Sequence, residues 1–215
     1  MEPGAIIFVG GDPVSLSDLP PLPDRVLVIA ADSGLDSARR LGVPVDLAVG
    51  DFDSADPAVV TAAVAAGTLL ERHSADKDAS DLELALEAAL GRGLSPVVVV
   101  GGGGGDRFDH LLANAALLGA ARYAPLRLRW LIKGTEVVAI HDRVEIEGSP
   151  GDLLTLLATG GPAGGVTTTG LRWRLVGATL KPGSTRGLSN EFSEKTATVS
   201  VSQGALLAIH TPRTS

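Results

Sequence analysis

The sequence of 215 residues contains no cysteine. Disulfide bonds, thiolate metal sites and cysteine nucleophiles are therefore excluded. A basic surplus is also lacking, because 18 Lys and Arg residues stand against 25 Asp and Glu residues, giving a formal net charge of −7. A chain of this kind is poorly suited to sequence-neutral binding of nucleic acid. We therefore expect no nucleic-acid partner.

Signals for secretion or membrane insertion are missing as well. The N-terminus has no basic segment, and the apolar run Ala5–Val9 is short for a secretory signal. The uncharged stretch Leu153–Leu171 is interrupted by several glycines and a proline, which argues against a membrane span. A hydrophobic content of 45% indicates a packed core. We therefore expect a soluble, cytoplasmic protein without a membrane partner.

The acidic excess is confined to one part of the chain. Residues 46–83 contain nine acidic and two basic residues, a difference that equals the whole net charge of −7. The remaining acidic and basic residues balance. The sequence therefore contains one acidic segment, and the protein as a whole is not acidic.

The first 132 residues alternate short apolar runs with helical patterns. Asp56 before Pro57 is typical of a helix start, and Ser80 with Glu83 forms a capping-box pattern. Strand–helix alternation predicts an α/β domain with a Rossmann-like, mostly parallel sheet and helices on both faces. The expected strands are Ala5–Val9, Val26–Ala30, Leu47–Val49, Thr68–Leu70, Val97–Val100 and Leu126–Ile132, and the expected helices are Leu35–Leu41, Pro57–Ala66, Leu82–Leu90 and His110–Tyr123.

The pattern changes after Lys133. Hydrophobic residues such as Val144 and Ile146 alternate with polar neighbours, and glycine- and proline-rich turns recur without an amphipathic helix. Short strands between such turns predict a smaller all-β domain, sandwich-like or a barrel. We place the boundary between residues 1–133 and residues 134–215.

Four successive predicted strands end in loops that carry reactive side chains. The carboxyl ends of parallel strands meet at one edge of a sheet, which is where ligands bind in open α/β folds. The four loops should therefore form a single site. They are Ala31–Gly34, Gly50–Ser54, Asp76–Asp81 and Gly101–His110.

Asp51 and Asp53 are separated by one residue. In an extended segment both carboxylates would face the same side, where they would repel each other. A hard divalent cation with oxygen ligands, such as Mg²⁺, would relieve that repulsion. The alternative is that each aspartate only caps a turn, or, for Asp81, favours the positive end of its helix.

The glycine run Gly101–Gly105 follows a strand and precedes a helix. Backbone N–H groups in this setting can approach phosphate oxygens, and the guanidinium of Arg107 can pair with phosphate. No Gly-Lys-Ser/Thr sequence closes the run, so it is not a P-loop. Asp109 could instead cap the next helix, and His110 could be a surface histidine. Acids, glycine amides and an arginine are together the parts of phosphoryl-type transfer.

In this order the motifs resemble those of the thiamine pyrophosphokinase family. That family shows Ala-Asp-Gly/Ser-Gly, Gly-Asp-Phe-Asp-Ser, Asp-Lys-Asp-x-Ser/Thr-Asp, a glycine-rich Arg-x-Asp-His loop followed by an asparagine, and Ser-x-Arg-Gly-x-Ser-Asn-Glu-Phe. Ser33 and Asp106 stand where many members have glycine. The matching segments are Asp32–Gly34, Gly50–Ser54, Asp76–Asp81, Gly101–His110 with Asn114, and Ser184–Phe192.

The resemblance implies that residues 1–133 form an α/β catalytic domain that binds ATP and Mg²⁺. Residues 134–215 would bind thiamine and dimerise, in a homodimer with active sites at the subunit interface. The implied reaction transfers pyrophosphate from ATP to the hydroxyl of thiamine, giving thiamine diphosphate and AMP. The alternatives are a pyrophosphokinase for another hydroxymethyl heterocycle, such as a pterin, and a non-catalytic sensor of thiamine or nucleotide.

The resemblance also implies roles for residues of the catalytic domain. Asp51, Asp53 and Asp81 would hold Mg²⁺, and together with Arg107 they would be the catalytic residues. The residues expected to bind or lie beside the ATP phosphates are Asp32, Lys77, Gly102, Gly103, Gly104, Arg107, Asp109 and His110.

Thiamine is expected to bind residues of the C-terminal domain. Ser189 and Asn190 match the family segment that meets thiamine, across the dimer from the acids. Asp81 would bind the substrate hydroxyl. The motifs contain no obvious dedicated base for that hydroxyl, although Asp81 could accept its proton. Trp173 would stack on an aromatic ring, although a tryptophan in a β domain more often serves packing.

Overall fold

The computed structural model of the protein divides into two compact units. It describes residues 4–16, 19, 22–23, 25–74, 76 and 78–213. The first unit comprises the chain up to Asn114 together with Leu128–Lys133, and the second comprises Ala115–Arg127 and the chain from Gly134 onwards. No helix in these described ranges is both long and apolar enough to cross a membrane.

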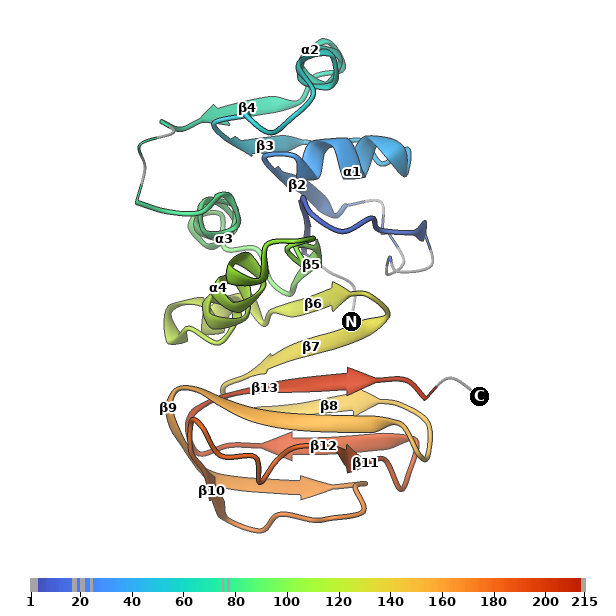
Figure 1. Ribbon diagram of the computed structural model, residues 1–215, viewed down its shortest axis with the longest axis vertical. Coiled ribbons are helices and arrows are strands. Elements are labelled where there is room, and N and C mark those ends of the chain that lie inside the picture. The colour runs from blue at the N-terminus through green and yellow to red at the C-terminus, as the bar shows by residue number, and fades with distance from the viewer. Residues whose placement is uncertain are drawn as a thin grey trace. The chain divides into compact units, whose positions relative to one another are not determined.

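The first unit is built on a parallel sheet, as the sequence predicts. Its strand order is β4-β3-β2-β1-β5-β6 (Figure 1). Every pairing between neighbours in this order is parallel. The strands are β1 (Ala5–Val9), β2 (Leu27–Ala31), β3 (Leu47–Gly50), β4 (Leu69–Arg72), β5 (Val97–Gly101) and β6 (Arg129–Ile132).

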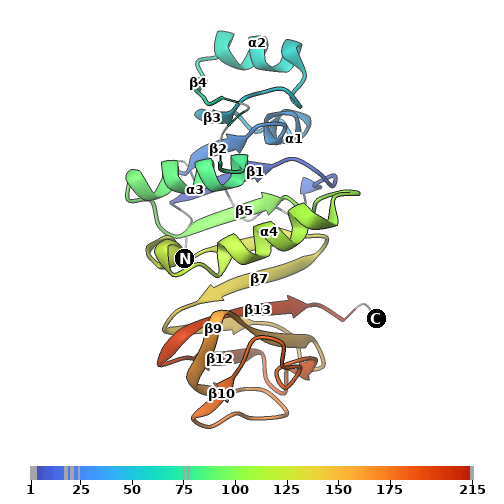
Figure 2. The same ribbon diagram turned by 60° about the vertical axis from the view of Figure 1, so that its left-hand side comes forward.

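Helices cover this sheet. The side chains of Ile6, Ile7 and Phe8 in β1 are fully buried, which requires cover on both faces of the central strand. Ala38 of α1 packs in one cluster with Ile6 and Phe8, and α3 packs against β1, β2 and β3 (Figure 2). The helices are α1 (Gly34–Arg40), α2 (Pro57–Ala65), α3 (Asp81–Gly91) and α4 (Phe108–Leu118).

Both predicted helix starts are confirmed. The Asp56 carboxylate accepts a hydrogen bond of 2.8 Å from the N–H of Ala58, and Pro57 occupies the first turn of α2. The Ser80 hydroxyl accepts a bond of 3.2 Å from the N–H of Glu83. These side chains satisfy N–H groups that have no partner within the helix. The Ser80 cap fixes the first residue of α3, which is Asp81.

One predicted helix is wrong in its extent. The segment expected as a single helix over 110–123 contains α4, which ends at Leu118, followed by a 3₁₀ helix over Ala121–Leu126. Gly119 interrupts the α-helix, since glycine is a poor helix former. The next strand, expected from Leu126, begins only at Arg129, because Arg127 adopts the left-handed conformation with φ +48°.

The second unit is rich in β-strands, as predicted for the C-terminal region, and its strand pairings are antiparallel. Its strands follow the order β7-β13-β9-β12-β8, and β10 and β11 also pair with β9. A hydrophobic cluster that includes Leu154, Leu206 and Phe192 packs among its strands. The strands are β7 (Thr135–Ile140), β8 (Arg143–Glu147), β9 (Leu153–Thr169), β10 (Ala178–Leu180), β11 (Asn190–Glu191), β12 (Thr196–Ser200) and β13 (Gln203–Thr211).

The long strand β9 accounts for the uncharged, glycine-rich stretch of the sequence. Its first part pairs with β13, and its last part, Thr167–Thr169, pairs with β12. The register against β13 jumps from Thr159 to Gly164, at a bulge that contains Gly160 and Gly161 with positive φ. Glycine tolerates this conformation without steric cost, so one strand can serve both neighbours.

The cap of α2 can be tested by substitution. Asp56→Ala removes the acceptor for the Ala58 N–H, and we expect a loss of about 1 kcal/mol in the free energy of unfolding of the first unit. Asp56→Ser retains an acceptor and serves as the control. Urea unfolding followed by circular dichroism should show a lower midpoint for the alanine variant only. Equal midpoints for the two variants would contradict the cap.

Candidate active site

Carboxylates from neighbouring strands meet at one edge of the sheet in the first unit. Asp32 follows β2, and Asp51 and Asp53 follow β3. One carboxylate oxygen from each of these three residues lies within 4.8 Å of the others. The prediction that the strand-end loops converge is therefore confirmed for these aspartates. Their oxygen atoms are the ligand type that hard divalent cations prefer.

The turn that presents Asp51 and Asp53 differs from the expectation of an extended segment. Phe52 between them adopts φ +63°, a conformation that is rare for a bulky side chain. Its ring is buried among Leu35, Val59 and other residues of one cluster, which anchors the turn. The carboxylates meet because Phe52 points into the core. The N–H of Asp53 also donates a 3.2 Å hydrogen bond to Asp51 Oδ1.

Asp81 lies next to this group, at the start of α3, although it is not one of the three residues whose oxygens lie within 4.8 Å of one another. A Cβ atom built on Gly50 would lie 3.1 Å from Asp81 Oδ1 and 3.2 Å from the Cβ of Asp32. The absence of a side chain at Gly50, together with its φ of +148°, lets these two aspartates approach the end of β3. Asp81 therefore lies close to Asp32 and to the end of β3, but its role as a metal ligand stays a prediction, because the clustered oxygens are those of Asp32, Asp51 and Asp53.

Asp32 is the most buried of these acids, with 6% of its surface exposed. Burial raises the pKa of its carboxyl, against an opposing hydrogen bond from the Ser33 backbone. The neighbouring negative charges of Asp81, Asp51 and Asp53 raise this pKa further. Its Oδ1 atom is buried without a hydrogen-bond partner among the described residues. A cation would supply the missing partner and offset the repulsion.

Other acids of the acidic segment have structural partners. Asp46 accepts a 2.8 Å hydrogen bond from the N–H of Val28, and Asp56 caps α2. Glu71 forms a 2.6 Å ion pair with Arg92 on the surface. The excess of acidic residues in the sequence therefore indicates the region of the site. It does not distinguish the aspartates of the site from acidic residues with structural roles.

The glycine loop after β5 is held by buried donors. The side-chain amide of Asn114 donates to the carbonyl of Gly102 at 2.8 Å, and the indole N–H of Trp130 donates to the carbonyl of Gly101 at 2.6 Å. The N–H of Gly102 donates to the carbonyl of Gly10 at 3.1 Å. These bonds fix the backbone between β5 and α4. The roles of Trp130 and Gly10 are not evident in the sequence.

The side chains at the start of α4 pair with each other. Arg107 and Asp109 form two hydrogen bonds, of 2.7 and 3.0 Å, and each side chain is more than half exposed. The guanidinium lowers the pKa of Asp109 to about 2. Asp109 lies in the first turn of α4, and His110 is exposed on the same turn. Lys77 lies outside the described residues.

The loop after β1 also reaches the glycine loop, which the sequence analysis missed. The N–H of Gly105 donates to Asp12 Oδ2 at 3.3 Å, and the ammonium of Lys133 lies 3.2 Å from the same oxygen. The sequence does contain a signal for this loop. The predicted strand Ala5–Val9 is followed by Gly10, Gly11 and Asp12, in the same way as four other predicted strands are followed by loops with reactive side chains.

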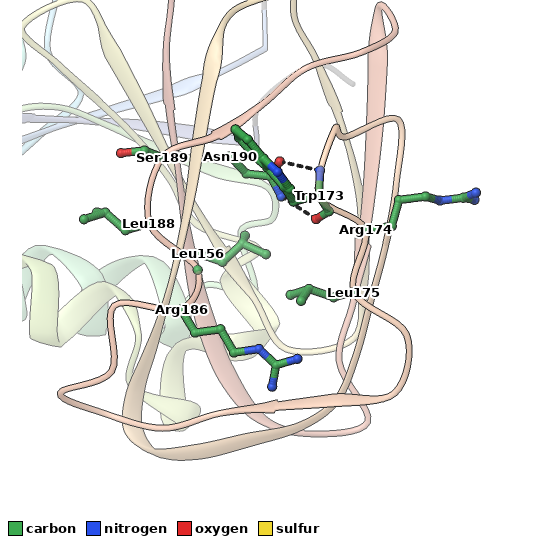
Figure 3. Close-up of a pocket in the computed structure, with 9 residues that line it drawn as sticks. Leu156, Trp173, Arg174, Leu175, Arg186, Leu188, Ser189 and Asn190 are labelled. Atoms are coloured by element: carbon green, nitrogen blue, oxygen red, sulfur yellow. Dashed lines mark hydrogen bonds between the residues drawn. The ribbon is translucent and has the colours of Figure 1, made fainter.

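In the second unit, the residues expected to meet thiamine line an open pocket of about 380 Å³ (Figure 3). Trp173, Ser189 and Asn190 are all in its wall, so the structure brings together this predicted group. The indole of Trp173 is 52% exposed and is not part of the core. The other lining residues are Leu156, Arg174, Leu175, Arg186, Gly187 and Leu188.

Asn190 holds the segment that carries Trp173. Its side-chain amide accepts a 3.1 Å bond from the N–H of Trp173 and donates a 2.7 Å bond to the carbonyl of the same residue (Figure 3). Arg172 lies with its guanidinium carbon 4.8 Å from the centre of the Trp173 ring. Asn190 therefore fixes the backbone that carries the Trp173 ring, while much of the ring surface remains accessible.

Two protein-family models match the chain. The model for the catalytic domain of thiamin pyrophosphokinase matches residues 22–128. The model for the vitamin B1 binding domain of thiamin pyrophosphokinase matches residues 142–206. The first match includes the carboxylate cluster and the glycine loop, and the second includes every residue of the pocket.

Comparisons with individual proteins also find thiamine pyrophosphokinases. The thiamine pyrophosphokinase of Bacillus subtilis (strain 168) is 29% identical over 207 residues, covering 94% of this chain and 96% of the relative. Thiamine pyrophosphokinase 2 of Oryza sativa subsp. japonica is 29% identical over 187 residues, covering 82% of this chain and 68% of the relative. The crystal structure of the Bacillus subtilis enzyme superposes with a TM-score of 0.81 at 25% identity, covering 98% and 99% of the two chains. Yeast thiamin pyrophosphokinase, at 14% identity, a TM-score of 0.73 and coverage of 98% and 87%, shares the fold.

The raised pKa of Asp32 predicts how stability depends on pH. Ionised Asp32 destabilises the metal-free protein above the usual pKa of an aspartate, and this penalty disappears as the pH falls and the carboxyl is protonated. In EDTA at pH 7, Asp32→Asn should therefore have a higher melting temperature than the wild type. The difference should shrink as the pH falls towards about 4. Asparagine tolerates the positive φ of this position.

The exposed carboxylate of Asp53 provides the matched control, because Asp53→Asn should raise the melting temperature less. A melting temperature at pH 7 below that of the wild type for Asp32→Asn would contradict the repulsion within the cluster.

Proposed function

The chain belongs to the thiamin pyrophosphokinase family, and we propose which of its residues carry out the family's reaction. Its activity is that of a thiamine pyrophosphokinase, an ATP-dependent enzyme that produces thiamine diphosphate. We propose that the hydroxyl of thiamine attacks the β-phosphorus of ATP and that AMP leaves. The observation that carries the assignment of the site is the cluster of Asp32, Asp51 and Asp53.

Mg²⁺ is the cation that we propose for this cluster. The proposed ligands are Asp51, Asp53 and Asp81, with Asp32 beside them. The all-oxygen donor set of the cluster supports a hard cation at this position, and the buried Oδ1 of Asp32, which has no hydrogen-bond partner among the described residues, supports placing Asp32 next to it. When bound, the ion would offset negative charge on the phosphates and on the four carboxylates. Asp81, at the N-terminus of α3, is proposed to accept the proton of the thiamine hydroxyl.

The phosphate chain of ATP is proposed to lie against the glycine loop. Buried hydrogen bonds from Asn114 and Trp130 to its carbonyls fix the backbone of the loop. The loop backbone therefore need not reorganise when a phosphate binds. Arg107 is exposed and would exchange its partner Asp109 for phosphate, which accepts the same two parallel hydrogen bonds. His110 and Lys77 remain proposed phosphate neighbours on the strength of the sequence motif.

Thiamine is proposed to bind in the pocket of the second unit. The indole of Trp173 would stack on an aromatic ring of the substrate, and Ser189 would offer a hydroxyl as a polar contact. Asn190 acts here through Trp173, since its amide is used to hold that residue's backbone. We therefore propose ATP- and Mg²⁺-binding for residues 1–133, and thiamine binding and dimerisation for residues 134–215.

A homodimer with active sites at the subunit interface completes the proposal. The phosphate-binding residues lie in the first unit and the thiamine pocket in the second, so one site can combine the first unit of one subunit with the second unit of its partner. We also propose a cytoplasmic location, where ATP is available as co-substrate.

The reaction is tested by its products. With ATP, Mg²⁺ and thiamine, the protein should form thiamine diphosphate and AMP in equal amounts, measured by chromatography. A panel containing a hydroxymethyl pterin should give no transfer. Formation of ADP and thiamine monophosphate would contradict pyrophosphate transfer, and binding of thiamine without AMP release would indicate a sensor.

The shared site is tested by mixed dimers. Asp53→Asn should lower kcat by roughly a hundredfold, because a ligand charge is lost. Trp173→Ala should mainly raise the KM for thiamine. Co-expression with two affinity tags allows the heterodimer of the two variants to be isolated.

In that heterodimer, one site combines both substitutions and the other combines none. Activity at low thiamine concentration should therefore recover to about half that of the wild-type dimer. If each site were built within one subunit, both sites would carry one substitution, and no recovery would be seen.

A further inference from the structure

Asp12 lies against the proposed phosphate loop and belongs to no motif identified in the sequence. A single oxygen, Oδ2, accepts the Gly105 N–H at 3.3 Å and lies 3.2 Å from the ammonium of Lys133. The Asp12 side chain is 22% exposed and that of Lys133 is 60% exposed. The Asp12 carboxylate is thus bound by the backbone amide of Gly105 and the ammonium group of Lys133.

The surrounding backbone is shaped to admit this carboxylate. A Cβ atom on Gly103 would overlap Asp12 Oδ2, so the oxygen occupies space that only glycine leaves open. Lys133 adopts φ +50°, a conformation that glycine or asparagine reaches at lower cost. Gly134, the next residue, also has a positive φ, of +70°, as the two central residues of a type I′ turn require, so the turn between β6 and β7 sets the position of this lysine.

The donors around Asp12 Oδ2 are those that bind a phosphate oxygen. Backbone amides of glycine-rich loops and a lysine ammonium together form anion sites in many nucleotide-binding proteins. A carboxylate oxygen and a phosphate oxygen present the same acceptor to these donors. Phosphate oxygens carry more total charge along the triphosphate chain, so they compete well for the same position.

We propose that Asp12 is an internal counter-anion that occupies a phosphate-oxygen position, and that the phosphate chain of ATP displaces it and takes over Lys133. Lys133 is then a phosphate-binding residue, and Asp12 sets how tightly ATP binds. This inference rests on the proposed function, because ATP is the ligand that displaces the carboxylate.

Calorimetry with inorganic tripolyphosphate in EDTA tests the displacement without metal or thiamine. Asp12→Asn removes the competing charge but keeps an acceptor for Gly105, so it should bind tripolyphosphate about threefold more tightly than the wild type. Lys133→Met should bind it about tenfold more weakly, because a charge-assisted contact is lost. The matched controls are Asp142→Asn and Lys195→Met at exposed positions of the second unit, which should change nothing.

The double variant separates binding from a purely structural ion pair. If Lys133 only neutralises Asp12, Lys133→Met has no further effect once Asp12→Asn is present. If Lys133 contacts the phosphate in place of Asp12, Lys133→Met still weakens tripolyphosphate binding tenfold in the Asp12→Asn variant. Melting temperatures should stay close to that of the wild type in each variant, since an ion pair with a largely exposed lysine stabilises little.

Weaker binding by Asp12→Asn, or loss of the Lys133→Met effect in the double variant, would overturn the inference. Turnover of ATP and thiamine by the wild type is measured separately. Normal turnover with unchanged tripolyphosphate binding in the variants would reject this inference alone, whereas absent turnover would reject the proposed function.

Discussion

Mutual repulsion among carboxylates at the end of β3 is the constraint on which the site depends. The carboxyl of Asp32 is buried, and its pKa is raised both by burial and by the charges of Asp51, Asp53 and Asp81. Such a cluster is unfavourable unless a cation or a proton offsets its charge. Buried Phe52, the glycine at position 50 and the Ser80 cap hold these groups together.

The parallel sheet is what turns separate motifs into one site. Each strand of the first unit ends at the same edge, so loops that are far apart in sequence meet there. Local contacts then orient the side chains. Buried Phe52 sets the turn between Asp51 and Asp53, and the N-cap Ser80 fixes where α3 begins. The second unit supplies a different surface, a pocket whose indole is positioned through Asn190.

Periodicity and the strand-end rule predicted the α/β unit, the β-rich unit and the meeting of the acids. An extended segment does not explain how Asp51 and Asp53 meet, because Phe52 between them is in a left-handed turn. The contacts of Asp12 and Lys133 join residues distant in sequence and depend on tertiary structure. Strand β9 was missed as a single strand because its glycines suggested a turn, whereas they form a bulge.

The central claim is that the carboxylate cluster binds a divalent cation. A crystal structure grown with Mn²⁺ and a non-hydrolysable ATP analogue tests this most directly, because manganese is located by its anomalous scattering. The account predicts an anomalous peak within coordination distance of carboxylate oxygens of both Asp51 and Asp53, close to Asp32. A bound analogue with no peak at this cluster, or with its metal held elsewhere, would contradict it.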